Sequence, residues 1–510
     1  MIIIKRNTIN KIEPYILGID IGTGSIKSVA VNLSGETFSS NQIHYQIPVS
    51  KKDLAEQDPE ITWQAFIECI QSHVQKLKGS PAAICLSSVM HSLIPVDKNG
   101  TPLSNMITWA DVRSADIAER IRSAAYGEDI YRKTGTPIHP MSPLCKMIWI
   151  RENDNDLFSK TYKFISIKEL IWFRLFNEFK IDISIASATG LFDIENNQWY
   201  KKSMELAGIQ SENLSTPVST DYNRSDCNAG VSSLLEITED VTFIIGAGDG
   251  CLANVGSFAM KKNEAAVTIG TSAAIRITGK KPIYNYNAMT FNYKLDEETF
   301  ICGGAINNGG NIVQWFLKNF LNKKELTDKE YENLFEEVDK VNAGADGLIF
   351  LPYLNGERAP HWDAKSCGTF FGVTAHHSQH TFSRAIIEGV CYALNDVLKT
   401  IETNENTITQ LNVSGGFVAS KTWMQILADI TGKRICIVHT NDASATGAAY
   451  LGLKTMKFIE DYDALIPKIN MEFLEPDSSN HKMYNNYFKI FQGLYHSLKD
   501  SMHAIYTLNH

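Results

Sequence analysis

A carboxylate and a group of small polar residues stand side by side near the start of the chain. Asp20 is the last residue but one of an apolar segment that ends at Ile21, the sequence Gly-Thr-Gly-Ser follows, and a second apolar segment then begins. Gly22 and Gly24 can adopt a positive φ and let a ligand approach the backbone. Thr23, Gly24 and Ser25 then offer donors to phosphate oxygens, as anion-binding turns do. A plain β-hairpin uses the same residue types. Taken alone, this turn is therefore equally compatible with a phosphate-binding site and with an ordinary hairpin turn.

The same pattern returns about 250 residues later, which is roughly the length of one domain. Gly270, Thr271 and Ser272 separate the apolar segments 265–269 and 273–277. We therefore expect two related α/β domains that face each other, each of which contributes a phosphate-binding turn.

A second candidate carboxylate, Asp249, follows the strand-like segment 241–245 and lies among three glycines. These small neighbours leave the carboxylate open to a substrate. As a general base for an acceptor hydroxyl it would contribute ~10²–10⁴-fold to the rate. The alternative is a turn aspartate that only caps the following helix.

Two other kinds of nucleotide site are excluded by the sequence. No GxxxxGK[ST] motif occurs, and the first turn lacks the third glycine of GxGxxG. What remains is a pair of phosphate-binding turns with carboxylates at strand ends, which suits a metal-bound nucleoside triphosphate. Phosphoryl transfer needs phosphate donors, a carboxylate near Mg²⁺ and a base, and Asp20 and Asp249 fit the last two roles.

Composition narrows the class of protein further. The chain has 510 residues, of which 57 are acidic and 48 basic, so two or three domains are expected and nucleic acid or an anionic membrane is a disfavoured partner. Its nine cysteines are scattered without metal-site spacing, which is typical of reduced thiols. No segment reaches transmembrane length and no signal-peptide core is found, so a cytoplasmic protein is expected.

Apolar periodicity predicts that these residues lie on strands and helices in alternation. A helix is expected over residues 63–77 and a buried strand over 82–88, after which Met90 and His91 follow. Ligands in open α/β sheets bind at the carboxyl ends of strands, so we expect a pocket there. The other expected segments are strands over 15–48, helices over 142–180, a loop over 183–190, a strand over 411–414, a helix over 421–431 and a helical tail after residue 475 with aromatic anchors at Tyr484, Tyr487, Phe488, Phe491 and Tyr495.

Two longer motifs resemble the signatures of the FGGY carbohydrate kinase family, within the actin-like ATPase superfamily. Residues 141–153 match the first signature throughout, and residues 368–373 with 385–388 match most of the second. Thr381 departs from the acidic, amide or histidine residue that is usual at its position. Lys146, inside the first signature, is expected to be a structural lysine, since most helical lysines are solvated surface charges.

The resemblance implies an α/β fold with two actin-like (ribonuclease H-like) ATPase domains, residues 1–256 and 257–510, on either side of an active-site cleft. It also implies an ATP-dependent sugar or polyol kinase with Mg²⁺. Asp249 would deprotonate the acceptor hydroxyl, and Asp20 with Asp249 would hold the metal. The residues implied to bind the nucleotide and its phosphates are Thr23, Gly24, Ser25, Gly270, Thr271, Ser272, Gly310, Gln314, Gly415, Gly416, Phe417 and Ser420.

Within the family, the motifs on the sugar side look most like those of gluconate kinases. The expected reaction is therefore ATP-dependent phosphorylation of D-gluconate to 6-phosphogluconate. Xylulose kinases share the Met-His pair but usually follow it with glycine, where this chain has Ser92. The residues implied to bind the substrate are Met90, His91, Trp109, Arg113, Met141 and Asp249.

A buried site must pair the carboxylate of gluconate with a cation or several donors, and Arg113 and His91 are the candidates. Each has an alternative: His91 as a packed wall of the pocket, and Arg113 in an ion pair with Asp111 or Asp116. Two other functions stay open, a kinase for xylulose or another neutral sugar or polyol and a non-metabolic actin-like ATPase. The expected partners are ATP and a small-molecule sugar acid, and a homodimer is left open.

Overall fold

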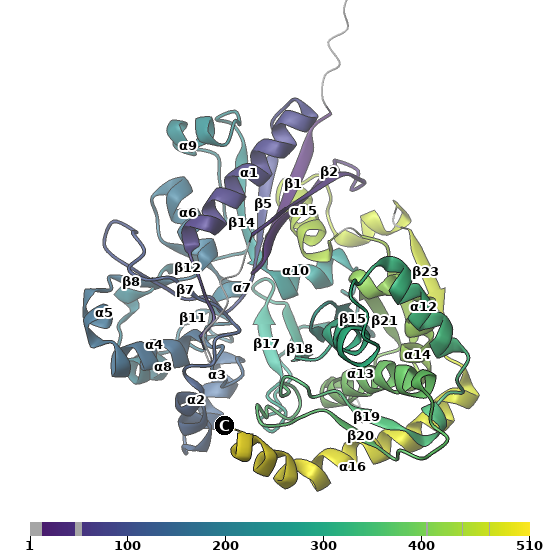
Figure 1. Ribbon diagram of the computed structural model, residues 1–510. Coiled ribbons are helices and arrows are strands. Elements are labelled where there is room, and N and C mark those ends of the chain that lie inside the picture. The colour runs from purple at the N-terminus through teal and green to yellow at the C-terminus, as the bar shows by residue number, and fades with distance from the viewer. Residues whose placement is uncertain (1–12, 46–53, 404–405, 441, 469, 510) are drawn as a thin grey trace, which may run out of the picture.

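The computed structural model describes residues 13–45, 54–403, 406–440, 442–468 and 470–509. Within these ranges the chain forms two α/β domains, one after the other, each built around a mixed sheet (Figure 1). The first sheet has six strands and the second has seven. This arrangement agrees with the fold class that the sequence predicts.

The first sheet starts with the meander predicted from the opening sequence. β1 (Tyr15–Ile21) pairs antiparallel with β2 (Ser25–Asn32), which pairs in turn with β3 (Thr37–His44). β5 and β14 extend the sheet on the other side of β1 and run parallel to it. Because these parallel strands end at one edge, Asp20 and Asp249 are brought to the same end of the sheet. The strand order is β13-β14-β5-β1-β2-β3, with β5 at Ala83–Ser88, β13 at Asn223–Arg224 and β14 at Thr242–Gly248.

The second sheet repeats this topology. β15 (Glu264–Ile269) pairs antiparallel with β16 (Ala273–Gly279), and β21 and β22 run parallel to β15 on its other side. The turns after β1 and β15 therefore occupy equivalent places in the two domains, as the repeated sequence pattern predicts. The strand order is β17-β18-β16-β15-β21-β22-β23, with β17 at Phe291–Lys294, β18 at Phe300–Ile306, β21 at Gln410–Ser414, β22 at Arg434–Val438 and β23 at Met471–Leu474.

Two helices rich in small residues join the domains. α10 (Asp249–Gly256) and α15 (Ala443–Thr455) cross in close contact. A Cβ atom on Gly256 would lie 2.0 Å from the carbonyl oxygen of Ala443, and one on Gly447 would lie 1.9 Å from a carbonyl oxygen of α10. These glycines permit the close approach, which fixes where α10, and with it Asp249, meets the second domain.

The remaining elements surround the sheets, and several of them build an extension of the first domain (Figure 1). The other helices are α1 (Pro59–Leu77), α2 (Ala115–Ser123), α3 (Gly127–Thr134), α4 (Pro143–Asn153), α5 (Asn155–Lys160), α6 (Ile167–Phe176), α7 (Ile183–Ala186), α8 (Lys201–Ala207), α9 (Ala229–Leu234), α11 (Gly310–Trp315), α12 (Asp328–Asp339), α13 (Gln379–Ile401), α14 (Lys421–Thr431) and α16 (Ser478–Asn509). Short helical turns are η1 (Ser211–Asn213), the π-helical η2 (Phe316–Phe320), η3 (Ala345–Gly347), η4 (Gly416–Ala419) and η5 (Tyr462–Lys468). The small strands are β4 (Glu56–Gln57), β6 (Ile94–Val96), β7 (Met106–Ile107), β8 (Lys163–Ile165), β9 (Lys180–Asp182), β10 (Phe192–Asp193), β11 (Gln198–Trp199), β12 (Thr216–Val218), β19 (Ile349–Leu351) and β20 (Thr369–Phe371).

Two expectations about local structure are wrong. The segment 142–180 is not helical throughout, because β8 interrupts it and pairs with β6. Residues 183–186 form helix α7 where a loop is expected. Asp182 explains the helix, since its Oδ1 accepts a hydrogen bond from the backbone N–H of Ile185 at 2.9 Å and caps the first turn. Residues 46–48 of the expected meander lie outside the described residues.

The tail forms one long helix, α16, which lies along the second domain (Figure 1). Tyr484, Phe488, Phe491 and Tyr495 are buried, as the anchors predicted in the tail should be. Tyr487, the fifth, is only partly buried.

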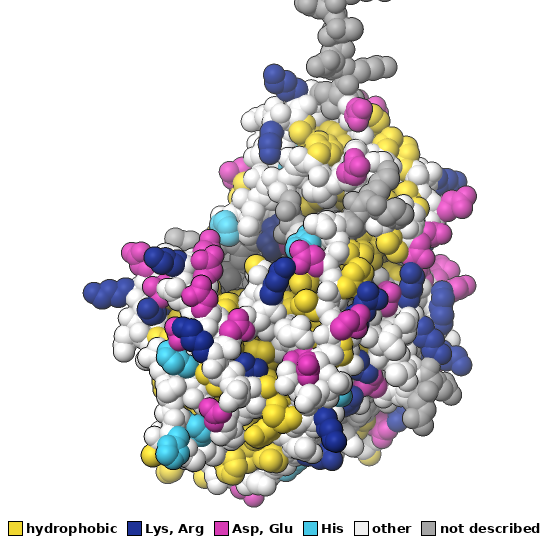
Figure 2. Space-filling view, turned by 90° about the vertical axis from the view of Figure 1, so that its right-hand side faces the viewer, with side chains coloured by type: hydrophobic (Ala, Val, Ile, Leu, Met, Phe, Trp, Pro, Cys, Tyr) yellow, Lys and Arg dark blue, Asp and Glu magenta, His cyan; other side chains and the backbone are white. Residues whose placement is uncertain are grey.

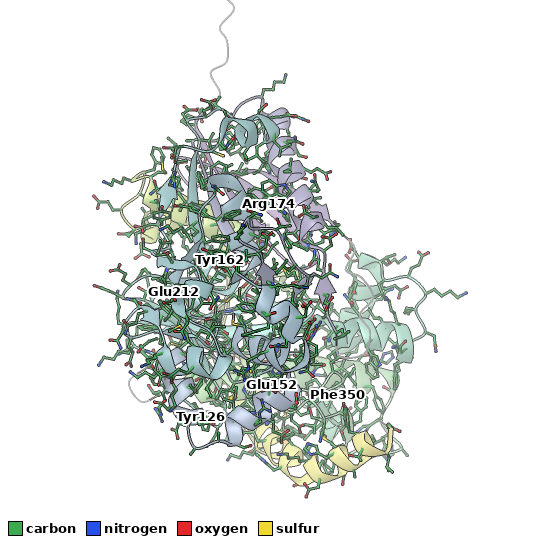
Figure 3. The ribbon with its side chains drawn as sticks, turned by 90° about the vertical axis from the view of Figure 1, so that its left-hand side faces the viewer. Tyr126, Glu152, Tyr162, Arg174, Glu212 and Phe350 are labelled. Carbon is green, nitrogen blue, oxygen red and sulfur yellow. The ribbon has the colours of Figure 1, made fainter. Side chains whose placement is uncertain are left out.

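The outer surface is mixed in character. Figure 2 shows basic and acidic side chains interspersed over one face of the molecule. In Figure 3, Tyr162, Arg174 and Glu212 lie on the outer face of the first domain. None of the described helices is both long enough and apolar enough to cross a membrane.

Candidate active site

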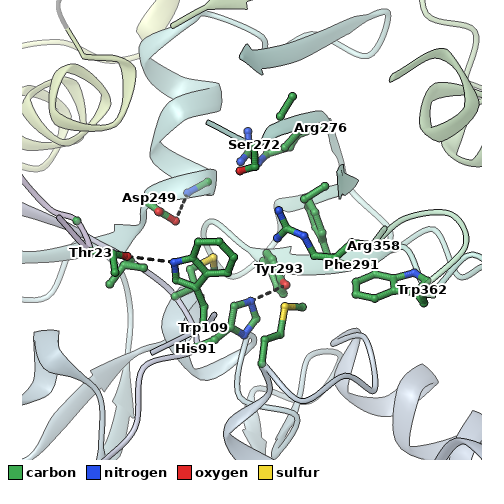
Figure 4. Close-up of a pocket in the computed structure, with 18 residues that line it drawn as sticks. Thr23, His91, Trp109, Asp249, Ser272, Arg276, Phe291, Tyr293, Arg358 and Trp362 are labelled. Carbon is green, nitrogen blue, oxygen red and sulfur yellow. Dashed lines mark hydrogen bonds between the residues drawn. The ribbon is translucent and has the colours of Figure 1, made fainter. Parts of the chain in front are cut away.

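A cavity of about 220 Å³ lies between the two domains and takes its lining from both (Figure 4). Asp249 and Thr23 face it from the first domain, and Ser272 faces it from the second. Residues from widely separated parts of the chain thus meet here. Those that the sequence predicts for a site and that line the cavity are Thr23, Met90, His91, Trp109, Met141, Asp249 and Ser272.

The first turn is tight and well supported. The backbone N–H of Gly22 donates to the carbonyl oxygen of Ser25 at 3.1 Å, and the Tyr45 hydroxyl donates to the carbonyl oxygen of Gly22 at 2.5 Å. The expected positive φ is wrong, since neither Gly22 nor Gly24 is among the described glycines that have one. Glycine is needed at position 22 for space, because a Cβ there would lie 2.9 Å from the Ser25 oxygen.

The second turn is tied to the start of α11. Gly270 donates its N–H to Ser272 O at 2.9 Å, and the Gly310 N–H donates to Gly270 O at 2.7 Å. A Cβ on Gly310 would lie 2.0 Å from the ring of Phe417. The carbonyl oxygen of Thr271 accepts from the N–H groups at the start of the same helix at 3.2 Å. The second turn, Gly310 and Phe417 are therefore neighbours.

A second cavity, of about 740 Å³, opens beside Phe417. Gly416, Phe417 and Ser420 line it together with residues of α12. The Ser420 hydroxyl caps α14 by accepting a hydrogen bond from Trp423 N at 3.2 Å, so this side chain has a structural role in the fold. Gly415 adopts φ +112° in the turn that presents Phe417, and Gln314 on α11 is exposed.

Asp249 is the first residue of α10 and points into the first cavity (Figure 4). Its Oδ1 accepts a hydrogen bond from the backbone N–H of Gly250 at 2.6 Å. Burial raises the pKa of Asp249, whereas the guanidinium of Arg276 and the Gly250 N–H act to lower it. A carboxylate with a raised pKa at the edge of a cavity is suited to accept a proton from a hydroxyl.

Asp20 belongs to a group of three carboxylates at the first turn. It is buried, and its Oδ1 accepts from the Ser87 hydroxyl at 2.6 Å. Burial, Asp442 and Asp249 raise the pKa of Asp20 to about 8, although Ser87 and Lys27 act to lower it. Lys27 pairs with Asp442 at 2.8 Å, and its charge also acts on Asp20.

The oxygen donors of these carboxylates, and the mutual repulsion that helps to raise the pKa of Asp20, fit a bound Mg²⁺. In the described part of the chain, no three Asp, Glu, His or Cys side chains lie close enough together to ligate one ion. The protein alone therefore supplies an incomplete ligand set, as is usual where substrate phosphates and water complete the coordination of Mg²⁺.

The ring of His91 is fixed by two hydrogen bonds. Nδ1 donates to the carbonyl oxygen of Ala188 at 2.8 Å, because a carbonyl can only accept. Nε2 then carries no proton and accepts from the Tyr293 hydroxyl at 3.1 Å (Figure 4). Burial and the nearby Lys146 lower the pKa of His91 to about 3. The imidazole is therefore neutral, which favours the pocket-wall alternative over a cation that pairs a carboxylate.

Two arginines that the sequence predictions omit line the cavity, Arg276 on β16 and Arg358 in the loop after β19 (Figure 4). Arg276 packs over Gly250, where an added Cβ would lie 3.0 Å from its Nε. Arg358 donates from Nε to Asn307 Oδ1 at 2.8 Å and lies over the ring of Trp109, 5.2 Å from its centroid. Burial lowers the pKa of both guanidinium groups, which remain cations at any physiological pH.

Comparison with known proteins identifies this architecture. The model of the N-terminal domain of the FGGY family of carbohydrate kinases matches residues 15–256, and the model of its C-terminal domain matches residues 265–456. The chain belongs to the FGGY family of carbohydrate kinases. It is thus a sugar kinase that transfers phosphate from ATP, and the alternative of a non-metabolic ATPase loses its support.

Relatives of this FGGY kinase include two kinds of sugar kinase. A gluconokinase of Bacillus subtilis is 38% identical over 491 residues, which cover 94% of this chain and 95% of the relative. A gluconate kinase structure from Lactobacillus acidophilus has a TM-score of 0.90 at 30% identity and covers 95% of this chain and 98% of its own. A ligand-bound xylulose kinase from the same organism has a TM-score of 0.92, also at 30% identity, with 96% and 100% covered.

Arg113 lies elsewhere in this FGGY kinase than the sequence suggested. It is not part of the cavity lining, and its Nη2 pairs with Asp111 at 2.8 Å and with Glu56 at 2.5 Å. Arg113 therefore forms the ion pair with Asp111 that the sequence leaves open as the alternative, although this pair is buried and not on the surface. Arg276 could have been found from the sequence, as the one charge in an apolar segment, whereas no local pattern marks Arg358.

Proposed function

We propose that this kinase phosphorylates D-gluconate at its terminal hydroxyl and produces 6-phosphogluconate and ADP. One observation carries the proposal: two guanidinium groups, Arg276 and Arg358, line the cavity that holds Asp249. A buried carboxylate must be paired with cations or several donors, and arginine binds carboxylates through two parallel hydrogen bonds. A neutral sugar has no such need. The similarity to gluconokinases supports the same substrate.

The chemistry asked of this chain is deprotonation and alignment. Asp249 takes the proton from the acceptor hydroxyl while that oxygen attacks the γ-phosphorus in line. The bond between the γ-phosphorus and the bridging oxygen breaks, and ADP leaves with the electron pair. Arg276, which acts to lower the pKa of Asp249, keeps the base ionised next to the developing charge.

The two turns would hold the phosphates from opposite sides of the cleft. Thr23, Gly24 and Ser25 belong to the first turn, and Gly270, Thr271 and Ser272 belong to the second. Asp20, with Asp249 nearby, would hold Mg²⁺ through its oxygens, and bound Mg²⁺ neutralises charge on the transferring phosphoryl group. Gly310, Gln314, Gly415, Gly416, Phe417 and Ser420 form the adenosine side of this proposal.

We also place the boundary between the domains after residue 256, where α10 ends. The family-model matches, which end at residue 256 and resume at residue 265, support this position. The catalytic aspartate would then belong to the first domain and the adenosine site to the second.

A kinase for xylulose or another neutral sugar is the competing function, and the xylulose kinase structure similar to this chain favours it. A direct competition separates the two. The enzyme is given Mg·ATP with equal concentrations of gluconate and xylulose, and mass spectrometry and ³¹P NMR identify which compound gains a phosphate and at which oxygen. We expect 6-phosphogluconate to dominate; predominant xylulose phosphate would refute the substrate assignment.

A further inference from the structure

Lys146 is buried, and among the described residues no carboxylate lies within salt-bridge distance of it. It lies on α4, has no exposed surface, and donates from its ammonium group to backbone oxygens. Nζ donates to the carbonyl oxygens of His91 at 2.6 Å, Thr108 at 2.8 Å and Ile107 at 3.4 Å. The expectation of a solvated helix lysine is therefore wrong. Burying an ammonium group costs free energy unless its donors are satisfied, and here all three protons have an acceptor.

Two of these carbonyls, those of His91 and Thr108, belong to loops that carry pocket residues, and the third, that of Ile107, ends β7. The loop after β5 presents Met90 and His91, and the loop after β7 presents Trp109. His91 adopts φ +66°, a left-handed conformation that costs a non-glycine residue free energy and persists only when its surroundings hold it. Because Lys146 binds the carbonyl oxygen of this residue, it opposes relaxation of the strained peptide.

Trp109 connects the second of these loops to the phosphate turn. Its indole Nε1 donates to the Thr23 hydroxyl at 3.0 Å, across the cavity wall (Figure 4). The face of its ring is covered by the guanidinium of Arg358. Since residue 108 is held by Lys146, a continuous chain of contacts runs from Lys146 through Trp109 to Thr23.

We infer that Lys146 is a positioning residue that fixes the sugar pocket against the first phosphate turn, through the backbone at residues 91 and 108 and the Trp109–Thr23 hydrogen bond. It does not line the cavity, so it acts through these residues and not on the substrates. The inference rests on the sugar kinase activity of the family and not on the identity of the sugar. Its failure would therefore leave the gluconate proposal untouched.

The test replaces Lys146 with methionine, which keeps the length of the side chain and removes its donors. Arg151→Met is the matched control, because Arg151 lies on the same helix and donates to a backbone carbonyl, Leu206 O, at 2.7 Å but leads away from the cavity. Activity is measured on the preferred sugar, at a temperature where circular dichroism shows both variants folded. A small displacement of reacting groups can cost ~10²-fold. We expect kcat/KM for the sugar to fall ~100-fold in Lys146→Met and to stay within about threefold in Arg151→Met.

A purely structural lysine would lower the unfolding temperature without this kinetic change. The inference is overturned if folded Lys146→Met retains kcat/KM within about threefold of the control. A double-mutant cycle with Trp109→Phe, which keeps an aromatic ring but removes the N–H, tests the path of the effect. If the fold-losses in kcat/KM of the two single variants multiply in the double variant, action through Trp109 is contradicted. If kcat/KM of the double variant lies no more than about threefold below that of Lys146→Met, action through Trp109 is supported.

If Lys146→Met does not fold, the single variant Trp109→Phe tests whether the link to the phosphate turn positions the reacting groups. Loss of the bond to Thr23 loosens the phosphate turn and not the contacts to the sugar. We therefore expect kcat to fall about tenfold while KM for the sugar changes less than about threefold. An unchanged kcat would show that the link to the phosphate turn has no role in positioning.

Discussion

The two arginines of the cavity give the sharpest prediction about substrate choice. Each is replaced in turn by methionine, which keeps much of the apolar volume and removes the charge. Arg358 and Arg276 both face the cavity that holds Asp249 (Figure 4). If these arginines pair the carboxylate of gluconate, the methionine variants leave that carboxylate in the cavity without its cation, and nothing compensates for its removal from water. Leaving one partner of a buried ion pair unpaired costs about 2–4 kcal/mol.

A free energy of about 1.4 kcal/mol corresponds to a tenfold change, so this loss predicts a fall of roughly 30- to 700-fold in kcat/KM for gluconate. A neutral sugar carries no carboxylate, so kcat/KM for xylulose should change less than about tenfold in Arg358→Met. Arg276 also acts on Asp249, whose pKa should rise without it. Arg276→Met should therefore lower kcat with every sugar and, in addition, lower the preference for the acid.

The assay is coupled ADP release over a range of sugar concentrations at saturating Mg·ATP. Arg113→Met is the matched control, because that guanidinium is tied to Asp111 and Glu56 outside the cavity lining. It should lower stability and leave the ratio of kcat/KM for the two sugars within about threefold. Equal losses for gluconate and xylulose in Arg358→Met and in Arg276→Met would refute the pairing of the carboxylate by these arginines.

Three further outcomes follow from the geometry of the cleft. Asp249→Asn should lower kcat by ~10²–10⁴-fold while ATP binding, measured by calorimetry, is retained; near wild-type turnover would exclude Asp249 as the base. Asp20→Asn should stabilise the ligand-free enzyme more at pH 8 than at pH 5. The pKa of Asp20 in the folded protein is about 8, whereas its ordinary value is 3.8. The wild type therefore loses stability through this carboxyl group as the pH rises between these two values, and the variant does not. Thermal unfolding at both pH values tests this, and an equal change at both would contradict the raised pKa. Gly310→Ala should raise KM for ATP at least about tenfold, because its Cβ would lie 2.0 Å from Phe417 and 2.8 Å from Gly270 O; an unchanged KM for ATP would separate this residue from the nucleotide site.

Local patterns in the sequence predict the scaffold of the cleft well. The two Gly/Thr/Ser turns and their flanking strands are contiguous in the chain, so strand periodicity and turn composition are enough to find them. α14 has the expected bounds for the same reason, since its apolar face repeats with helical spacing. Asp249 stands out because glycines surround it at the end of a buried strand.

The charges in the cavity depend on contacts between distant segments, which no local pattern contains. Arg358 reaches the pocket from the second domain and packs on Trp109, about 250 residues away in sequence. Arg113 is a residue type that can bind a carboxylate of a substrate, but it forms ion pairs with Asp111 and Glu56. His91 is in the pocket as predicted, yet burial makes it neutral, and the charge of a histidine cannot be read from its neighbours in the chain.

We propose that this FGGY kinase acts on a sugar acid in the cleft that holds Asp249. The most direct test is the ratio of kcat/KM for gluconate to that for xylulose, measured by ADP release with the wild-type enzyme and with glycerol and ribulose alongside. A site built around a charged group discriminates strongly against analogues that lack it, so we expect a ratio of ~10² or more. A ratio below one would show that the enzyme prefers the neutral sugar and would refute the assignment of the cleft to a sugar acid.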